Sequence, residues 1–261
     1  VLTLAQVRHN RHTHGSARWS EGVEELQDAG LLSSDNDSVY VGAVKTPSGG
    51  LRYLRHSGPE HILTLAPTRS GKSLAAIMTL LSWTSSIFVL DLKGELSKIT
   101  SGWRRLYAKN KILIYEPAHP NSIAWNPLDE IDINSPSAVA DAQNLADLLV
   151  DPEGKGLNSH WDKTAQALLT GMILYVLIKA RNGGPRASLA LIDRELANPT
   201  RDIKDLWHEM VAMDDLCPVA AAAGKDMIDR PDEEGGSVLS TAKSFLSLYR
   251  DPVVARNTSR S

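Results

Sequence analysis

The stretch Ala66-Pro67-Thr68-Arg69-Ser70-Gly71-Lys72-Ser73 carries the strongest structural signal in this sequence of 261 residues. It matches the phosphate-loop pattern Gly-x-x-x-x-Gly-Lys-Ser/Thr at every fixed position except the first, where Ala66 replaces glycine. An apolar run precedes it and a helical pattern follows it, as the motif requires. Small residues let several backbone N–H groups face one phosphate, and the following helix adds its positive end. The sequence therefore predicts a nucleotide-binding loop.

The predicted ligand of this loop is ATP with Mg²⁺. Lys72 would place a positive charge at the β- and γ-phosphates, and the Ser73 hydroxyl would be a ligand of Mg²⁺. The alternative is a chance match in a turn, which the flanking elements disfavour. The residues expected to contact the nucleotide are Pro67, Thr68, Arg69, Ser70, Gly71, Lys72 and Ser73.

Three short apolar runs surround the loop, at His61–Leu65, Ser86–Leu90 and Lys111–Tyr115. Each is too short for a helix and is bounded by turn residues, so each is predicted to be a buried strand. Leu74–Trp83 has the apolar spacing of a helix. This alternation is typical of a parallel sheet in an α/β domain. Ahead of it, Val39–Val44 and Leu51–Leu54 indicate a hairpin.

Two acidic residues follow the second predicted strand. Asp91 ends this strand and is a candidate to hold Mg²⁺ through water, together with Ser73. Glu95 is a candidate base for activating water. The predicted catalytic residues are therefore Lys72, Asp91 and Glu95. The alternative for Asp91 is that it caps a turn.

The second half of the sequence is predicted to be helical. Ser135-Pro136 is typical of a helix start. The helical patterns cover Ala138–Val150, Trp161–Ile178, Leu189–Ala197, Ile203–Val211, Val219–Ile228 and Val238–Tyr249, the last preceded by a predicted loop at 231–236. The predicted organisation is an N-terminal polar segment with a hairpin (1–57), the first part of a phosphate-loop domain (58–133), an all-α domain (134–252) and a return toward the phosphate-loop domain (253–261).

The composition sets broad limits. With 42% hydrophobic and 23% charged residues and a net charge of −3, the chain can bury a core and is not a uniformly basic nucleic-acid binder. Its single cysteine, Cys217, excludes an internal disulfide and fits a reducing compartment. Three histidines in residues 9–14 suggest either a metal site or, more simply, a solvated stretch. Because the sequence starts at Val1 rather than at Met, we expect it to be a fragment.

Charge is unevenly distributed. Residues 93–111 hold six Lys/Arg against one Glu, with Trp103 and Tyr107 interleaved. This basic patch could contact a nucleic-acid backbone or a neighbouring subunit, or could be a solvated helix face. Residues 129–162 hold eight Asp/Glu against one lysine, which indicates a protein partner or simple solubility.

Several blocks together resemble the TraG-type coupling proteins of type IV secretion and conjugation. The resemblance runs from about residue 14 to 261. The blocks are His14-Gly15-Ser16-Ala17-Arg18-Trp19, Gly58-Pro59-Glu60-His61, the phosphate loop with its Ala66, Leu90-Asp91-Leu92-Lys93-Gly94-Glu95, Trp125-Asn126-Pro127-Leu128-Asp129-Glu130 and Gly235-Gly236-Ser237-Val238-Leu239-Ser240-Thr241-Ala242.

The resemblance implies a RecA-like ATPase that assembles as a homo-hexamer at the cytoplasmic face of the bacterial inner membrane. Its all-α domain would be inserted in the nucleotide-binding domain. Its partners would be relaxase or relaxosome proteins, single-stranded DNA bound without sequence preference, and components of the secretion channel. The membrane anchor is expected before Val1 and an Asp-Glu pair beyond Ser261, which reduces Asp91 to an auxiliary acid and leaves this fragment inactive by itself.

Two other functions stay open at this point. One is a recruitment platform that binds nucleotide without hydrolysing it. The other is an unrelated phosphate-loop ATPase, such as a kinase or a chaperone ATPase. The long helical region and the block at Trp125–Glu130 disfavour a small-molecule kinase.

Overall fold

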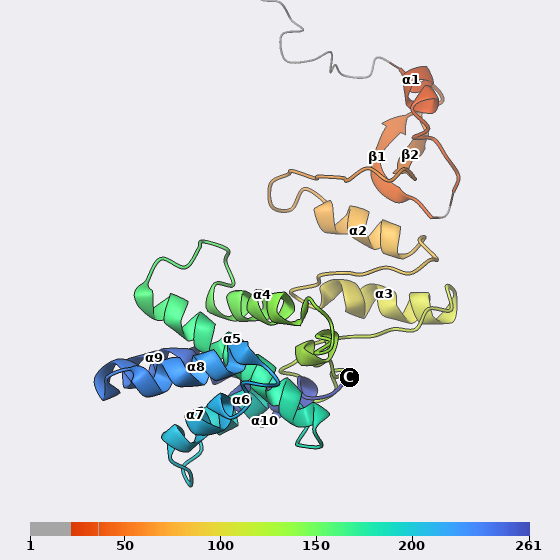
Figure 1. The fold of residues 1–261 in the computed structure, drawn as a ribbon. Helices are drawn as coiled ribbons and strands as arrows, with labels where there is room; N and C mark the ends of the chain where they lie inside the picture. The colour runs from red at the N-terminus through yellow and green to blue at the C-terminus, as the bar shows by residue number, and fades with distance from the viewer. Residues whose placement is uncertain (1–21, 36) are drawn as a thin grey trace, which may run out of the picture. The chain divides into compact units, whose positions relative to one another are not determined.

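The computed structural model describes residues 22–35 and 37–261, so the histidines at 9–14 lie outside the described residues. The chain divides into two compact units, a first unit of residues 1–112 and a second of residues 113–261. The second is called the helical unit below. Figure 1 draws the elements of both.

The described part of the first unit contains a β-hairpin and three helices. Strands β1 (Val39–Lys45) and β2 (Leu51–His56) pair antiparallel, with one irregularity between Tyr40 and Gly42. The connecting turn closes through Thr46 N–H and the Gly50 carbonyl at 2.8 Å. The predicted hairpin is thus confirmed. The helices are α1 (Val23–Asp28), α2 (Lys72–Leu80) and α3 (Glu95–Leu106).

The structure does not show the predicted parallel sheet. Within the described residues, 61–65, 86–90 and 111–115 run extended but belong to no strand, and β1–β2 is the one sheet. Their apolar side chains face solvent: Leu65 is 84% exposed and Phe88 is 93% exposed. An apolar sequence can favour an extended backbone, but a strand also needs a neighbour for its N–H and C=O groups. In this chain these segments do not provide that neighbour for one another.

The helical unit follows the predicted helical patterns closely. Two predicted helices have the predicted bounds, and most others agree within one to three residues at each end. The helices are α4 (Ala138–Val150), α5 (His160–Arg181), α6 (Leu189–Leu196), α7 (Ile203–Val211), α8 (Pro218–Asp229), α9 (Asp232–Phe245) and α10 (Pro252–Asn257), with the 3₁₀ turns η1 (Pro127–Glu130) and η2 (Ser247–Arg250).

The largest difference from the sequence prediction is at the start of α9. Helix α9 already begins at Asp232, inside the segment 231–236 that was expected to be a loop. Three acidic residues in its first turn complement the positive end of the helix, which offsets the low helix propensity of the two glycines that follow. Helix α4 begins at Ala138 as predicted, and the Ser135-Pro136 pair lies in the bend and turn just before it.

Helix α5 is the centre of the helical unit. Residues from Leu168 to Val176 are almost completely buried, since α4, α6, α8 and α9 pack around this helix. Figure 1 shows α8 and α9 running beside it. Each fully buried Leu or Ile contributes about 1.5–3 kcal/mol. In the described part of the chain no helix, α5 included, has the length and apolar character needed to cross a membrane.

Two glycines permit the closest helix approaches in this core. A Cβ added at Gly171 of α5 would lie 2.4 Å from Ala223 Cβ of α8. A Cβ at Gly224 of α8 would lie 2.7 Å from the Trp207 carbonyl oxygen of α7. The second contact is with backbone, which cannot move aside as a side chain can. The α7–α8 spacing therefore requires glycine at position 224.

The two ends of the helical unit are bound to each other by backbone and amide hydrogen bonds. Trp125 N–H donates to the Asn257 carbonyl at 2.9 Å, and the Asn257 side-chain amide donates to the carbonyls of Pro117 and His119, each at 2.9 Å. Asn126 is fully buried and donates from its side chain to the Ala187 carbonyl. The segment 117–126, which precedes α4, therefore lies beside α10. The two connections of an inserted domain would lie close together in the same way.

Gly224→Ala is expected to lower the free energy of unfolding of the helical unit by about 1–3 kcal/mol, because the added methyl group forces α7 and α8 apart. Gly236→Ala in α9 is the matched control, since nothing lies within 4 Å of a Cβ there. The control should be neutral or stabilising by about 0.5–1 kcal/mol. Denaturant titration followed by circular dichroism measures both, and equal destabilisation by the two substitutions would contradict the close α7–α8 packing.

Candidate functional site

The phosphate loop lies at the start of helix α2. The helix begins at Lys72, and its N-cap residue Gly71 has φ +91°, a conformation that favours glycine. Arg69 also has positive φ, at +66°. For a residue with a side chain this costs on the order of 1 kcal/mol. Left-handed residues within a turn direct successive N–H groups toward one side, which is the geometry of an anion-binding nest. All eight residues 66–73 are exposed.

Lys72 is folded back onto the loop that precedes it. Its Nζ donates to the Ala66 carbonyl at 2.5 Å and to the Pro67 carbonyl at 2.7 Å. Both acceptors are exposed oxygens, and a phosphate oxygen is a stronger acceptor for an ammonium group than a neutral carbonyl. The lysine ammonium therefore lies at the loop, where a bound anion would compete with these two carbonyls for it.

Asp91 caps helix α3. Its Oδ2 accepts from Ser97 N–H at 2.8 Å, and the turn before the helix passes through Gly94, at φ +66°. Glu95 is exposed in the first turn of α3. Among the described residues, no hydrogen bond joins Asp91 or Glu95 to the phosphate loop. Asp91 thus makes a capping contact, which was the alternative that the sequence left open. A role of Asp91 in holding Mg²⁺ stays a prediction.

The basic patch of residues 93–111 does not present all of its cations to solvent. Arg104 is 5% exposed, and its guanidinium donates to three backbone carbonyls. Arg104 is therefore not available to a nucleic-acid phosphate. Arg105 and Lys109 are exposed. The rings of Trp103 and Tyr107 stack with centroids 6.1 Å apart. The part of the patch left for an anionic partner is the exposed face of α3 and the residues just after it.

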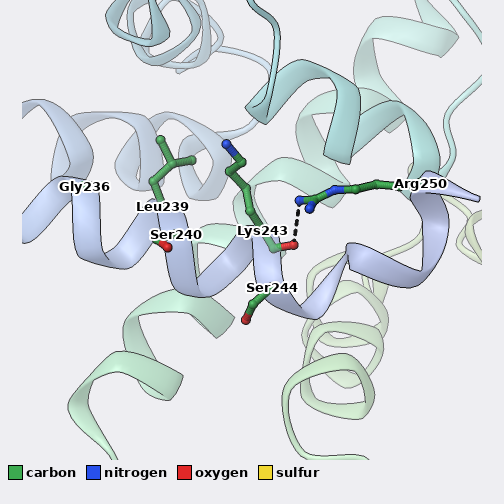
Figure 2. A pocket seen from close by; sticks show the side chains of 6 residues that line it. All are labelled: Gly236, Leu239, Ser240, Lys243, Ser244 and Arg250. Atoms are coloured by element: carbon green, nitrogen blue, oxygen red, sulfur yellow. Dashed lines mark hydrogen bonds between the residues drawn. The ribbon is translucent and has the colours of Figure 1, made fainter.

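The helical unit has a shallow hollow along α9, which no sequence motif indicated. Figure 2 shows the side chains that line it, with Lys243 and Arg250 at one end. Arg250 donates to both carboxylate oxygens of Asp193 and to the Lys243 carbonyl. Its charge is therefore already paired. The lining residues are Gly236, Leu239, Ser240, Lys243, Ser244 and Arg250.

The fold and the loop define a protein that has a phosphate-loop sequence at a helix start in one unit and a bundle of helices in the other. The chain belongs to the family described as type IV secretory system conjugative DNA transfer, which matches residues 18–261. The family resemblance seen in the sequence blocks is thereby confirmed.

Curated relatives agree with this assignment. The chain is 51% identical to a conjugal transfer protein TraG of Escherichia coli, over 100% of this chain and 44% of that protein. It is 30% identical to protein VirD4 of Agrobacterium fabrum, over 100% of this chain and 39% of that protein. The chain thus spans less than half the length of these relatives.

Proposed function

We propose that the chain is the nucleotide-binding and substrate-facing part of an ATP-driven coupling protein for conjugative DNA transfer. The observation that carries this proposal is the exposed Lys72 at the start of α2, hydrogen-bonded to its own loop, in a chain of the conjugative DNA-transfer family. Lys72 and the N–H groups of the loop would bind the phosphates, and Ser73 would hold Mg²⁺. The bound nucleotide supplies the free energy for moving the transferred strand.

We propose further that residues 61–65, 86–90 and 111–115 become neighbouring strands of a parallel sheet in the longer protein. Their extended backbones, their apolar side chains and the solvent exposure of those side chains support this. A sheet of this kind is buried on both faces and reads as continuous apolar runs. It would place the phosphate loop at the carboxyl end of the first strand, where α/β proteins bind their ligands.

The partners of the whole protein follow as proposals. Relaxase or relaxosome proteins, single-stranded DNA and secretion-channel components would be its partners, and it would act as a homo-hexamer at the cytoplasmic face of the inner membrane. The acidic stretch 129–162 disfavours contact of that region with DNA phosphates, so the helical unit is the proposed surface for a protein substrate. The exposed cations on and after α3 are the proposed contact with DNA.

A second candidate function is a recruitment platform that binds nucleotide without hydrolysing it. The capping bond of Asp91 favours it, because a carboxylate engaged by Ser97 N–H has less freedom to hold Mg²⁺. Steady-state ATP turnover by the full-length protein, with and without single-stranded DNA, separates the two. Turnover that DNA stimulates supports the translocase, and nucleotide binding without turnover supports the platform.

Lys72→Ala is expected to weaken ATP binding by the full-length protein by about 2–4 kcal/mol, or roughly 30- to 700-fold in Kd, because a charged phosphate contact is lost. The fold should be unchanged, since Lys72 is exposed. Lys45→Ala, an exposed lysine of β1, is the control and should bind like the wild type. Isothermal titration with a non-hydrolysable ATP analogue measures this. Equal affinity of Lys72→Ala and wild type would contradict the nucleotide site.

The double variant Arg105→Ala/Lys109→Ala is expected to flatten the dependence of log affinity on log salt for single-stranded DNA by about 2 units, one for each lost phosphate contact. The control is Lys155→Ala/Lys225→Ala, whose ammonium groups already face Glu153 and Asp229 and should not change the slope. Fluorescence anisotropy at several salt concentrations gives the slopes. A slope like that of the wild type would contradict the DNA contact and show that the patch is a solvated surface.

A further inference from the structure

The junction that follows the phosphate-loop helix is held from two sides by charged side chains. Helix α2 carries Lys72 at its start and ends at Leu80, and residues 81–85 then lead into the extended segment that ends at Asp91. The helix has nine residues and is therefore only about 13 Å long. A change in direction at its last turn is transmitted to the phosphate loop at its first turn.

Arg104 binds the carbonyl groups of this junction. Its Nη1 donates to the Leu80 carbonyl at 2.9 Å and to the Trp83 carbonyl at 2.6 Å, and its Nη2 donates to the Ser85 carbonyl at 2.9 Å. Carbonyls at a helix end lack helical partners, and a cation there also complements the helix dipole. A planar guanidinium can reach three such acceptors at once, whereas a lysine ammonium on a flexible stem cannot hold the same geometry.

Asp37 binds the donor groups of the same junction. Its Oδ1 accepts from Thr84 N–H at 2.9 Å and from the Thr84 hydroxyl at 3.0 Å, and its Oδ2 accepts from the Ser85 hydroxyl. The hydrogen bond from Ser85, with those from Thr84, lowers the pKa of Asp37 to about 2. Asp37 is therefore ionised at neutral pH. A little further along the chain than Asp37, Tyr40 N–H donates to the Thr79 hydroxyl in the last turn of α2.

Arg104 and Asp91 also fix the two ends of helix α3. Asp91 accepts from Ser97 N–H at the start of α3. Arg104, near the end of α3, donates to the Leu80 carbonyl in the last turn of α2. Helix α2, the junction, the segment 86–91 and helix α3 therefore form a closed chain of contacts. The contact that closes this chain is the one made by Arg104, which joins the end of α3 to the end of the helix that begins at Lys72.

We propose that Arg104 and Asp37 are positioning residues for the nucleotide site, which hold the junction 81–85 so that Asp91 keeps a fixed place relative to Lys72 and Ser73. This role rests on the proposed nucleotide-binding function. It assigns to Arg104 a purpose different from the DNA contact that its basic neighbourhood suggested. The contacts of Arg104 and Asp37 to this junction are called the clamp below. Because Lys72 keeps its contacts to its own loop, loss of the clamp should lower the rate of ATP hydrolysis more than the affinity for nucleotide.

The kinetic test uses the full-length protein with Arg104→Lys and Asp37→Ala. We expect kcat for ATP to fall by about tenfold or more while the Kd for a non-hydrolysable analogue changes little, because displaced groups slow the reaction without removing the phosphate contacts. The Mg²⁺ concentration for half-maximal turnover should rise. Arg52→Lys, a change at an exposed arginine of β2, is the control and should leave kcat unchanged. Asp37→Asn, which keeps an acceptor for Thr84 N–H, should recover part of kcat. Thermal unfolding verifies that each variant is folded.

A distance measurement tests the clamp without relying on activity. The one cysteine of the 261-residue chain, Cys217, is buried, so spin labels can be placed at Ser70→Cys and at Leu92→Cys, which is highly exposed beside Asp91. We expect Arg104→Lys and Asp37→Ala to broaden the distance distribution between the labels, and Arg52→Lys to leave it narrow. Wild-type protein that binds no nucleotide would overturn the proposed function. Unchanged distances and unchanged kcat in both clamp variants would overturn the positioning role alone.

Discussion

The pairing of backbone N–H and C=O groups is the constraint on which this structure depends, and the two units meet it in different ways. In the helical unit most backbone groups are paired within the helices, and side chains bind N–H groups in the first turns of several of them. Ser159, Ser188 and Asp202 each accept a backbone N–H at the start of a helix. Such caps contribute about 1 kcal/mol each. These side chains satisfy donors in the first turns of α5, α6 and α7, whereas α4, α8 and α9 begin without a side-chain cap.

The first unit meets the same constraint mainly at turns and junctions. Asp37 and Arg104 supply the partners that the residues after α2 lack, one for the donors and one for the acceptors. The extended apolar segments have no comparable arrangement. Leu63, Phe88 and Leu90 are each more than three-quarters exposed, which is unusual for residues in continuous apolar runs. A sheet completed in the longer protein would pair these backbones and bury these side chains together, and it would also fix the position of the phosphate loop.

The sequence was most informative where local periodicity decides the structure. Ile203–Val211 and Ala138–Val150 were predicted with the bounds that the structure has, because their apolar residues recur at helical spacing. It was less informative at α9, where an acidic first turn offsets two glycines. The parallel sheet was predicted from apolar runs that alternate with helical patterns. A run can predict a strand, but it cannot specify the neighbour with which that strand pairs.

The candidate site was predictable to a similar degree. The loop residues 66–73 and the start of the helix at Lys72 follow from a motif with a local mechanism. The burial of Arg104 could not be predicted, because it depends on carbonyls about twenty residues earlier in the chain, and charge counting treats it like Arg105. A signal was nevertheless present, since an arginine on the inner face of an amphipathic helix must find acceptors there.

Hydrogen exchange measured on the backbone amides of residues 61–65, 86–90 and 111–115 tests the central claim most directly, namely that these segments are strands of a nucleotide-binding sheet in the longer protein. The account predicts slow exchange of these amides in the full-length protein and fast exchange in the 261-residue chain, with the helical unit equally protected in both. Fast exchange of all three segments in the full-length protein would contradict it.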